Sequence, residues 1–174
     1  DDATGKFTFF IGNEEIKDDD DNVIDTRVPD GNALIIAYDD DANTLWSWHV
    51  WVTGSDVEAS AIKTSVGTFM DRNLGAYHNS NGSTKADDIY RSYGMYYQWG
   101  RKDPFLGYSS VTKTTVAKST ISWPSVVSTS SSVGTVDYTV ANPTTYITAF
   151  SSPYDWHYSS GDNTLWQSGK TIYD

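Results

Sequence analysis

The three histidines, His49, His78 and His157, are the first residues whose chemistry could support catalysis. None of them lies in an HExxH pattern, and no nucleophile motif is near any of them. His49 lies in an apolar segment, where a hydrogen-bonded structural histidine is commoner than a catalytic one. His78 lies in an Asn/Ser-rich loop and is expected to be exposed. His157 follows Asp155 and Trp156, but one Asp-x-His pattern does not define an active site. The sequence therefore predicts a protein that is not an enzyme.

Acidic residues at alternate positions are the second candidate for chemistry. Two segments match the D-x-D-x-N opening of a calcium loop, namely Asp18, Asp20 and Asn22, and Asp39, Asp41 and Asn43. Neither segment continues with the glycine and the later glutamate that complete such a loop. Acidic turns between two strands are the alternative explanation, because aspartate and asparagine favour turns. Calcium is the one cofactor that the pattern suggests, and the alternative is a protein without a cofactor.

Aromatic side chains near the end of the chain are the third candidate. They lie among Ser, Asp and Asn residues, and the set comprises Tyr154, Trp156, His157, Tyr158 and Trp166. Sugars stack on exposed aromatic rings, so this segment is a candidate carbohydrate-binding site. Packing in the core is the alternative, since Tyr and Trp serve both purposes.

Composition excludes several classes of function. The 174 residues carry 23 acidic and 12 basic side chains, for a net charge of −11, and no cysteine. There can be no disulfide, cysteine nucleophile or thiolate metal site. The charge is concentrated in residues 1–41, which hold thirteen acidic and three basic residues. No basic stripe is present, so nucleic acid is not an expected partner. No apolar run approaches the roughly 20 residues of a membrane span.

The elements that must position these residues are mainly strands. The chain is rich in Thr, Ser, Val, Tyr and Trp, which favours a mainly β, β-rich α+β fold. The segment LWSWHVWV, residues 45–52, contains Trp46, Trp48 and Trp51 and predicts a buried strand with both faces covered. Together with residues 33–38 it predicts a hairpin over 33–52, with an acidic loop at 39–43.

Shorter signals predict the remaining elements. Residues 6–11, 66–70 and 95–99 are expected to form strands, residues 18–22 a turn, and residues 84–92 a short helix. Residues 109–135 are dominated by Ser and Thr and predict an extended surface excursion. A boundary is expected near residue 54, after the aromatic strand.

Two further segments carry charged residues beside aromatic ones. In TFMDRNLGA, residues 68–76, Asp71 and Arg72 can pair or cap a turn, and Asn73 tolerates a left-handed backbone. In YGMYYQWGRKDPF, residues 93–105, a charged corner follows a strand and includes Trp99, Arg101, Lys102 and Asp103. An Asp71–Arg101 or an Arg72–Asp103 ion pair would join the two segments. These residues are expected to determine the fold, and a ligand site is the alternative.

In their order, LWSWHVWV, TFMDRNLGA and YGMYYQWGRKDPF resemble segments of the fimbrillin-family surface proteins of Bacteroidota. The middle region also resembles the Fibrobacter succinogenes major domain, which is related to the C-type-lectin-like fold of formylglycine-generating enzymes. The resemblance covers residues 33–174 and continues through three further segments: STISWPSVVSTSSSVGT, NPTTYITAF and YDWHYSSGDNTLWQSGKTIYD.

The resemblance implies two parts. Residues 1–54 would form the terminal strands of a β-sandwich. Residues 55–174 would form the first part of a C-type-lectin-like domain, with a Ser/Thr-rich excursion at 106–141. Fold alone does not transfer the activity of formylglycine-generating enzymes, which depends on cysteine or copper chemistry, and the chain has no cysteine.

The implied function is a non-enzymatic, cell-surface adhesion or fimbrial protein, associated with a pilus, that presents a lectin-like binding surface. The alternative is a carbohydrate-binding module for polysaccharide capture. The implied location is extracellular, at the outer membrane. Members of the family continue beyond the segment that KTIYD ends here, so a C-terminal continuation or a companion chain is an expected partner. Other pilus subunits and glycans are the remaining expected partners.

Overall fold

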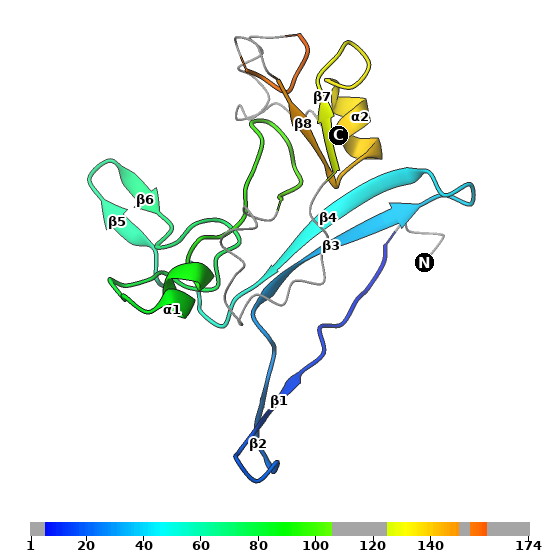
Figure 1. Ribbon diagram of the computed structural model, residues 1–174. Coiled ribbons are helices and arrows are strands. Elements are labelled where there is room, and N and C mark those ends of the chain that lie inside the picture. Colours follow the sequence, from blue (N-terminus) through cyan, green and yellow to red (C-terminus); the bar gives the residue numbers. More distant parts are fainter. Residues whose placement is uncertain (1–5, 106–124, 150–153, 160–174) are drawn as a thin grey trace.

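A computed structural model of the chain describes residues 6–105, 125–149 and 154–159. Within these residues the protein is mainly strands with two short helices (Figure 1), which confirms a β-rich fold. The strands are β1 Glu14–Lys17, β2 Val23–Arg27, β3 Gly31–Tyr38, β4 Thr44–Val52, β5 Ile62–Thr64, β6 Gly67–Phe69, β7 Ser125–Ser128 and β8 Thr145–Thr148; the helices are α1 Ala86–Arg91 and α2 Val136–Ala141.

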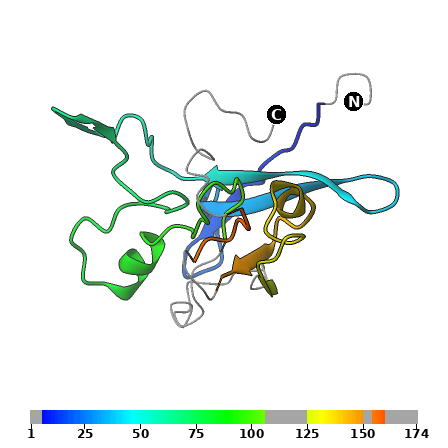
Figure 2. The same ribbon diagram turned by 90° about the horizontal axis from the view of Figure 1, so that it is seen from above.

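The described strands form four two-stranded sheets. The pairs β1–β2, β3–β4 and β5–β6 are antiparallel hairpins, and β7–β8 is a parallel pair. A parallel pair needs a crossover connection, and α2 lies in it. The long β3–β4 hairpin occupies the centre, while β1–β2 and β5–β6 project from it as separate arms (Figures 1 and 2).

The hairpin predicted over residues 33–52 is confirmed. Residues Gly31 to Tyr38 pair with Val52 to Thr44, and the acidic loop connects the two strands. The expectation that β4 is buried on both faces is wrong. Ser47 is its one buried residue, while Leu45 and Trp48 are exposed. The reason is that a two-stranded sheet offers few neighbours to cover it.

One face of β4 is hydrogen-bonded to the region of residues 71–105. Ser47 Oγ donates to Asp103 Oδ1 over 2.8 Å, and Trp51 Nε1 donates to the Ala76 carbonyl oxygen over 3.0 Å. These bonds cross the boundary that the sequence predicts near residue 54. The aromatic strand β4 is therefore hydrogen-bonded directly to the segment of residues 71–105.

Of the shorter predicted elements, some are confirmed and others are wrong. The strand at 66–70 and the helix at 84–92 appear as β6 and α1, and residues 18–22 form the turn between β1 and β2. Residues 6–13 belong to no strand, and β1 begins at Glu14 instead. Residues 95–99 contain only an isolated bridge between Tyr96 and Phe105. Alternating aromatic residues produce a strand only where a second strand supplies hydrogen bonds.

The segment predicted as an extended excursion contains regular structure in its described part. Residues 125–128 form β7, and α2 begins after Thr135, whose Oγ1 accepts a hydrogen bond from Tyr138 N over 3.1 Å. Residues 106–124 lie outside the described residues. This part of the chain also contributes to an apolar cluster. In it, Ile147 of β8 and Trp156 pack against Val127, Val133, Val136 and Tyr138.

Each described helix spans six residues, so neither has the length or the apolar character to cross a membrane. This agrees with the prediction from the sequence for the part of the chain that the structure describes.

Candidate binding surface around Trp156

Trp156 belongs to the candidate site, but its side chain is buried and is not available to a ligand. Its side chain is 3% exposed, and its indole Nε1 donates to the carbonyl oxygen of Trp99. Its own carbonyl oxygen accepts from Thr129 Oγ1 over 2.6 Å. The predicted role of Trp156 as a ring on which a sugar stacks is therefore contradicted, because both faces of the indole are enclosed by protein.

Three exposed aromatic residues are connected to Trp156: Tyr154 and Tyr158 lie two positions before and after it in the chain, and the Trp99 carbonyl oxygen accepts from its indole. Tyr154 is 71% exposed, Tyr158 is 58% exposed and Trp99 is 47% exposed. The first two were predicted as ligand-binding residues. Trp99 was predicted only as part of a structural motif, and the sequence carries no signal that it lies beside residue 156. Trp166, also predicted here, lies outside the described residues.

The backbone of residues 154–158 is fixed by specific bonds. Tyr158 N donates to the carbonyl oxygen of Gly134 over 2.9 Å, and His157 N donates to Asp155 Oδ1 over 3.1 Å. Gly134 leaves no room for a Cβ atom, because the backbone of residues 156 and 158 lies directly against it. The His157 ring lies edge-on to the Trp156 ring, with 5.3 Å between centroids. Tyr154 adopts φ = +61°, a left-handed backbone that is uncommon for an aromatic residue.

Gln98 and Arg101 form hydrogen bonds to β8, the strand whose Ile147 packs against Trp156. The Gln98 side chain accepts from Ile147 N over 3.1 Å and donates to Ile147 O over 2.6 Å. Arg101 is buried, and its Nη1 donates to Gln98 Oε1 over 2.9 Å and to Thr145 O over 2.7 Å. Its guanidinium group lies over the Phe105 ring, 4.8 Å from the centroid. Arg101 is therefore a structural residue of the core and not part of an open charged corner.

Asp103 is also buried and joins the corner to β4. It accepts from Ser47 Oγ and from Lys102 Nζ, which lies 2.9 Å from its Oδ2. The same ammonium group donates to Ser47 O over 3.0 Å and lies 4.6 Å from the centre of the Trp46 ring. The negative charge of Asp103 is thus balanced by its neighbour in sequence, and the predicted Arg72–Asp103 pair does not form.

Asp71 and Arg72 pair with each other. Arg72 Nε and Nη2 donate to the two carboxylate oxygens over 2.7 and 2.9 Å, and Asn79 Nδ2 donates over 2.7 Å. The hydrogen bonds from Arg72 lower the pKa of Asp71 below its ordinary value. Arg72 Nη1 also donates to Thr53 Oγ1 over 3.1 Å. The predicted Asp71–Arg101 pair is wrong, because each charged residue is satisfied locally. Asn73 donates through Nδ2 to two backbone carbonyl oxygens of the turn that follows α1.

The acidic loop at 39–43 is a hydrogen-bonded turn. Asp39 Oδ1 accepts from Asp41 N over 3.0 Å and from Asn43 N over 2.8 Å. Asp18 makes the same bonds in the turn between β1 and β2. Among the described residues, no group of three or more His, Asp or Glu side chains is placed to hold a metal ion. Both acidic patterns form hydrogen-bonded turns between strands, which is the structure expected from the alternative explanation.

The histidines occupy different environments. His49 Nε2 lies 2.9 Å from Asn32 Oδ1, and its Nδ1 lies 3.4 Å from the Tyr97 hydroxyl. Burial lowers the pKa of His49, and the charge of Asp103 opposes that shift. His49 is thus hydrogen-bonded between the hairpin and the following region, as a structural histidine would be. His78 is half-buried rather than exposed, with Nδ1 2.6 Å from the Asn79 carbonyl oxygen.

Comparisons with known proteins do not assign a class or a family. No protein-family model, curated protein or solved structure matches the chain. The resemblance to fimbrillin-family proteins and to the lectin-like domain therefore stays a prediction from the quoted segments.

Proposed function

We propose that the chain is a non-enzymatic, cell-surface adhesion or fimbrial module that binds carbohydrate. The binding surface is formed by Trp99, Tyr154 and Tyr158, with His157 at its edge. In this proposal residues 1–54 end a β-sandwich, and residues 55–174 begin a C-type-lectin-like domain outside the cell.

The observation that carries the proposal is that exposed aromatic side chains are attached to a buried, hydrogen-bonded part of the fold. The three aromatic side chains are exposed by 47–71%, while Trp156, which lies between Tyr154 and Tyr158 in the chain, is buried and hydrogen-bonded to the backbone of residue 99. Because the backbone of residues 154–158 is hydrogen-bonded in place, little backbone conformational entropy is lost there when a ligand binds. Tyr and Trp also offer an apolar face and a polar atom, which suits a sugar.

The charged residues support binding rather than turnover. Asp71 forms an ion pair with Arg72 and accepts a hydrogen bond from Asn79. Asp103 forms an ion pair with Lys102 and accepts a hydrogen bond from Ser47. His49 is held between Asn32 and Tyr97. These side chains have the partners of structural residues, as expected for a scaffold.

The alternative is polysaccharide capture, which the same aromatic residues favour. The two functions differ in the ligand, since adhesion requires recognition of short or terminal glycans on a surface. Capture requires binding along a polymer. A glycan array that includes both terminal glycans and long plant or host polysaccharides separates them.

The test compares glycan binding by the 174-residue chain with that of single variants. Trp99→Ala and Tyr158→Ala should each weaken binding about tenfold, which corresponds to about 1.4 kcal/mol. Tyr38→Ala is the matched control, because Tyr38 is an exposed tyrosine at the far end of β3. Unchanged affinity in both surface variants, with binding intact in the wild type, would remove these residues from the site. Absence of any binding to the array would overturn the proposal.

A further inference from the structure

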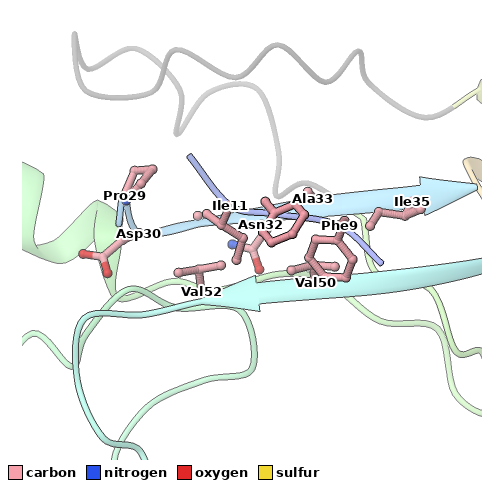
Figure 3. Close-up of a pocket in the computed structure, with 11 residues that line it drawn as sticks. Phe9, Ile11, Pro29, Asp30, Asn32, Ala33, Ile35, Val50 and Val52 are labelled. Carbon is pink, nitrogen blue, oxygen red and sulfur yellow. The ribbon is translucent and has the colours of Figure 1, made fainter. Parts of the chain in front are cut away.

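An open apolar groove lies along β3 and β4. It has a volume of about 300 Å³ and lies between the hairpin and the extended segment of residues 6–13 (Figure 3). Its lining is almost entirely apolar and includes Phe9, Ile11, Ala33, Ile35, Val50 and Val52. The segment covers the hairpin through side chains, as in the contact between Phe7 and Trp48, whose ring centroids are 4.5 Å apart. The groove is a place where a further apolar group can be buried.

The β5–β6 hairpin carries a matching projection. Ile62 and Phe69 are opposite each other in the register and are 54% and 53% exposed. Val66, in the turn between the strands, is 84% exposed. Turns ordinarily carry polar residues or glycine, so an aliphatic residue in the turn beside an exposed apolar pair is unusual. We call Ile62, Val66 and Phe69 the apolar tip.

We infer that the apolar tip of one copy of this chain occupies the groove of a second copy. Charge favours this arrangement. Residues 61–70 contain Lys63 and no acidic residue, whereas Asp30 lies at the groove and residues 1–41 carry ten net negative charges. Groove-to-groove pairing would bring two acidic regions together, which costs free energy. Insertion of the tip would bring Lys63 toward Asp30.

The placement of the two features makes the association head to tail. In both views of the molecule the β5–β6 hairpin projects away from the β3–β4 hairpin, whereas residues 6–13 lie over one face of β3 and β4 (Figures 1 and 2). The tip and the groove are different surfaces, so each copy can engage two others. Such a heterologous contact does not close after two copies and extends into chains unless rotation closes a ring. This inference extends the proposed fimbrial role and is independent of the carbohydrate surface.

The test is sedimentation velocity of the 174-residue chain over a range of concentration up to about 1 mM, without glycan, since a small contact is expected to be weak. The weight-average mass of the wild type should rise to twice the monomer mass or more. Val66→Asp in the tip and Ile11→Asp in the groove should each keep the chain monomeric. Val126→Asp is the matched control, because Val126 is an aliphatic residue that is 62% exposed on β7.

The decisive measurement is a mixture of the two monomeric variants. Val66→Asp keeps an intact groove and Ile11→Asp keeps an intact tip, so the mixture should form dimers and nothing larger. Equal melting temperatures show that the variants are folded, and Phe9→Asp replaces Ile11→Asp if the latter is not. A wild type that stays monomeric overturns the inference. So does a mixture that stays monomeric, association of Val66→Asp on its own, which would indicate groove-to-groove pairing, or loss of association in Val126→Asp.

Discussion

At the scale of single residues, buried polar side chains provide hydrogen bonds that a third strand would otherwise provide. The amide of Gln98 bonds to both the N–H and the C=O of Ile147, and Arg101 bonds to the carbonyl oxygen of Thr145. These bonds attach β8 to the segment of residues 96–105. The position of Trp156 depends on this attachment, because it packs on Ile147.

Arg101→Lys tests that role. An ammonium group cannot reproduce the forked geometry of guanidinium toward Gln98, Thr145 and Asn142, and it leaves buried acceptors unsatisfied. The free energy of unfolding should fall by about 2–4 kcal/mol, measured by urea denaturation. Arg27→Lys, on exposed β2, should leave the denaturation midpoint unchanged. A similar midpoint for Arg101→Lys and the wild type would show that the buried bonds contribute little.

The pair of Asp71 and Arg72 gives a prediction on pH. The pKa of Asp71 is lowered in the folded state, so its ionised form stabilises the fold above the unfolded pKa of about 4, and this stabilisation is lost as pH falls through the folded pKa. Asp71→Asn should therefore be less stable than the wild type at pH 7, and the difference should shrink on acidification below pH 4. Thermal unfolding across pH 3–7 measures it. A difference that does not depend on pH would contradict the assignment.

At the scale of elements, the same five-residue turn closes two hairpins. Asp18 to Asn22 and Asp39 to Asn43 have equivalent backbone and side-chain hydrogen bonds, and the fourth residue of each has a positive φ, +66° at Asp21 and +62° at Ala42. Both turns are followed by a shift in strand register. This conformation suits the twist of a hairpin and favours glycine at the fourth position.

Ala42→Gly should stabilise the protein by about 1 kcal/mol, because alanine is strained at positive φ and glycine is not. The control is Ala33→Gly within β3, which should destabilise it by about 0.5–1 kcal/mol. Chemical denaturation of both variants checks the difference in sign. Equal destabilisation by the two changes would exclude backbone strain at residue 42.

Elements with a local cause are those that the sequence predicts well. The hairpin at 33–52, the acidic turns, the strand at 66–70 and the helix at 84–92 follow from turn residues and short-range patterns. The strand expected at 6–11 fails because no backbone partner lies beside it in a sheet. The element α2 was missed because Ser and Thr dominate the preceding segment.

The candidate site was only partly predictable for a similar reason. Tyr154 and Tyr158 are exposed as expected, but Trp156 is buried by Ile147 and by the backbone around Gly134, which are distant in sequence. Trp99 joins the site through one hydrogen bond across 57 positions. Contacts of this range leave no periodic pattern in a single sequence.

At the scale of the whole molecule, burial is uneven. Every residue of β2 is exposed, whereas β8 alternates buried and half-buried residues and contributes Ile147 to the core. A two-stranded hairpin without a covering layer is only marginally stable in water. The arm of β1 and β2 is therefore expected to open without unfolding the rest.

Amide hydrogen exchange measured by mass spectrometry should show this difference. Peptides covering residues 23–27 should exchange at rates close to those of an unfolded chain, and peptides covering residues 145–148 should be the better protected by at least tenfold. The β3–β4 hairpin should lie between these limits, because one face is hydrogen-bonded and the other is partly open. Equal protection of β2 and β8 would contradict this order of stability.

The two faces of the β3–β4 hairpin have a consequence for avidity. One face is hydrogen-bonded to residues 71–105, the region that contributes Trp99, and the other lines the apolar groove. Copies joined through the groove would leave the exposed rings of Trp99, Tyr154 and Tyr158 uncovered. Every copy added to such a row of molecules would then contribute one more weak carbohydrate site. A ligand with repeated sugar units would then be retained far longer by the row than by any single copy.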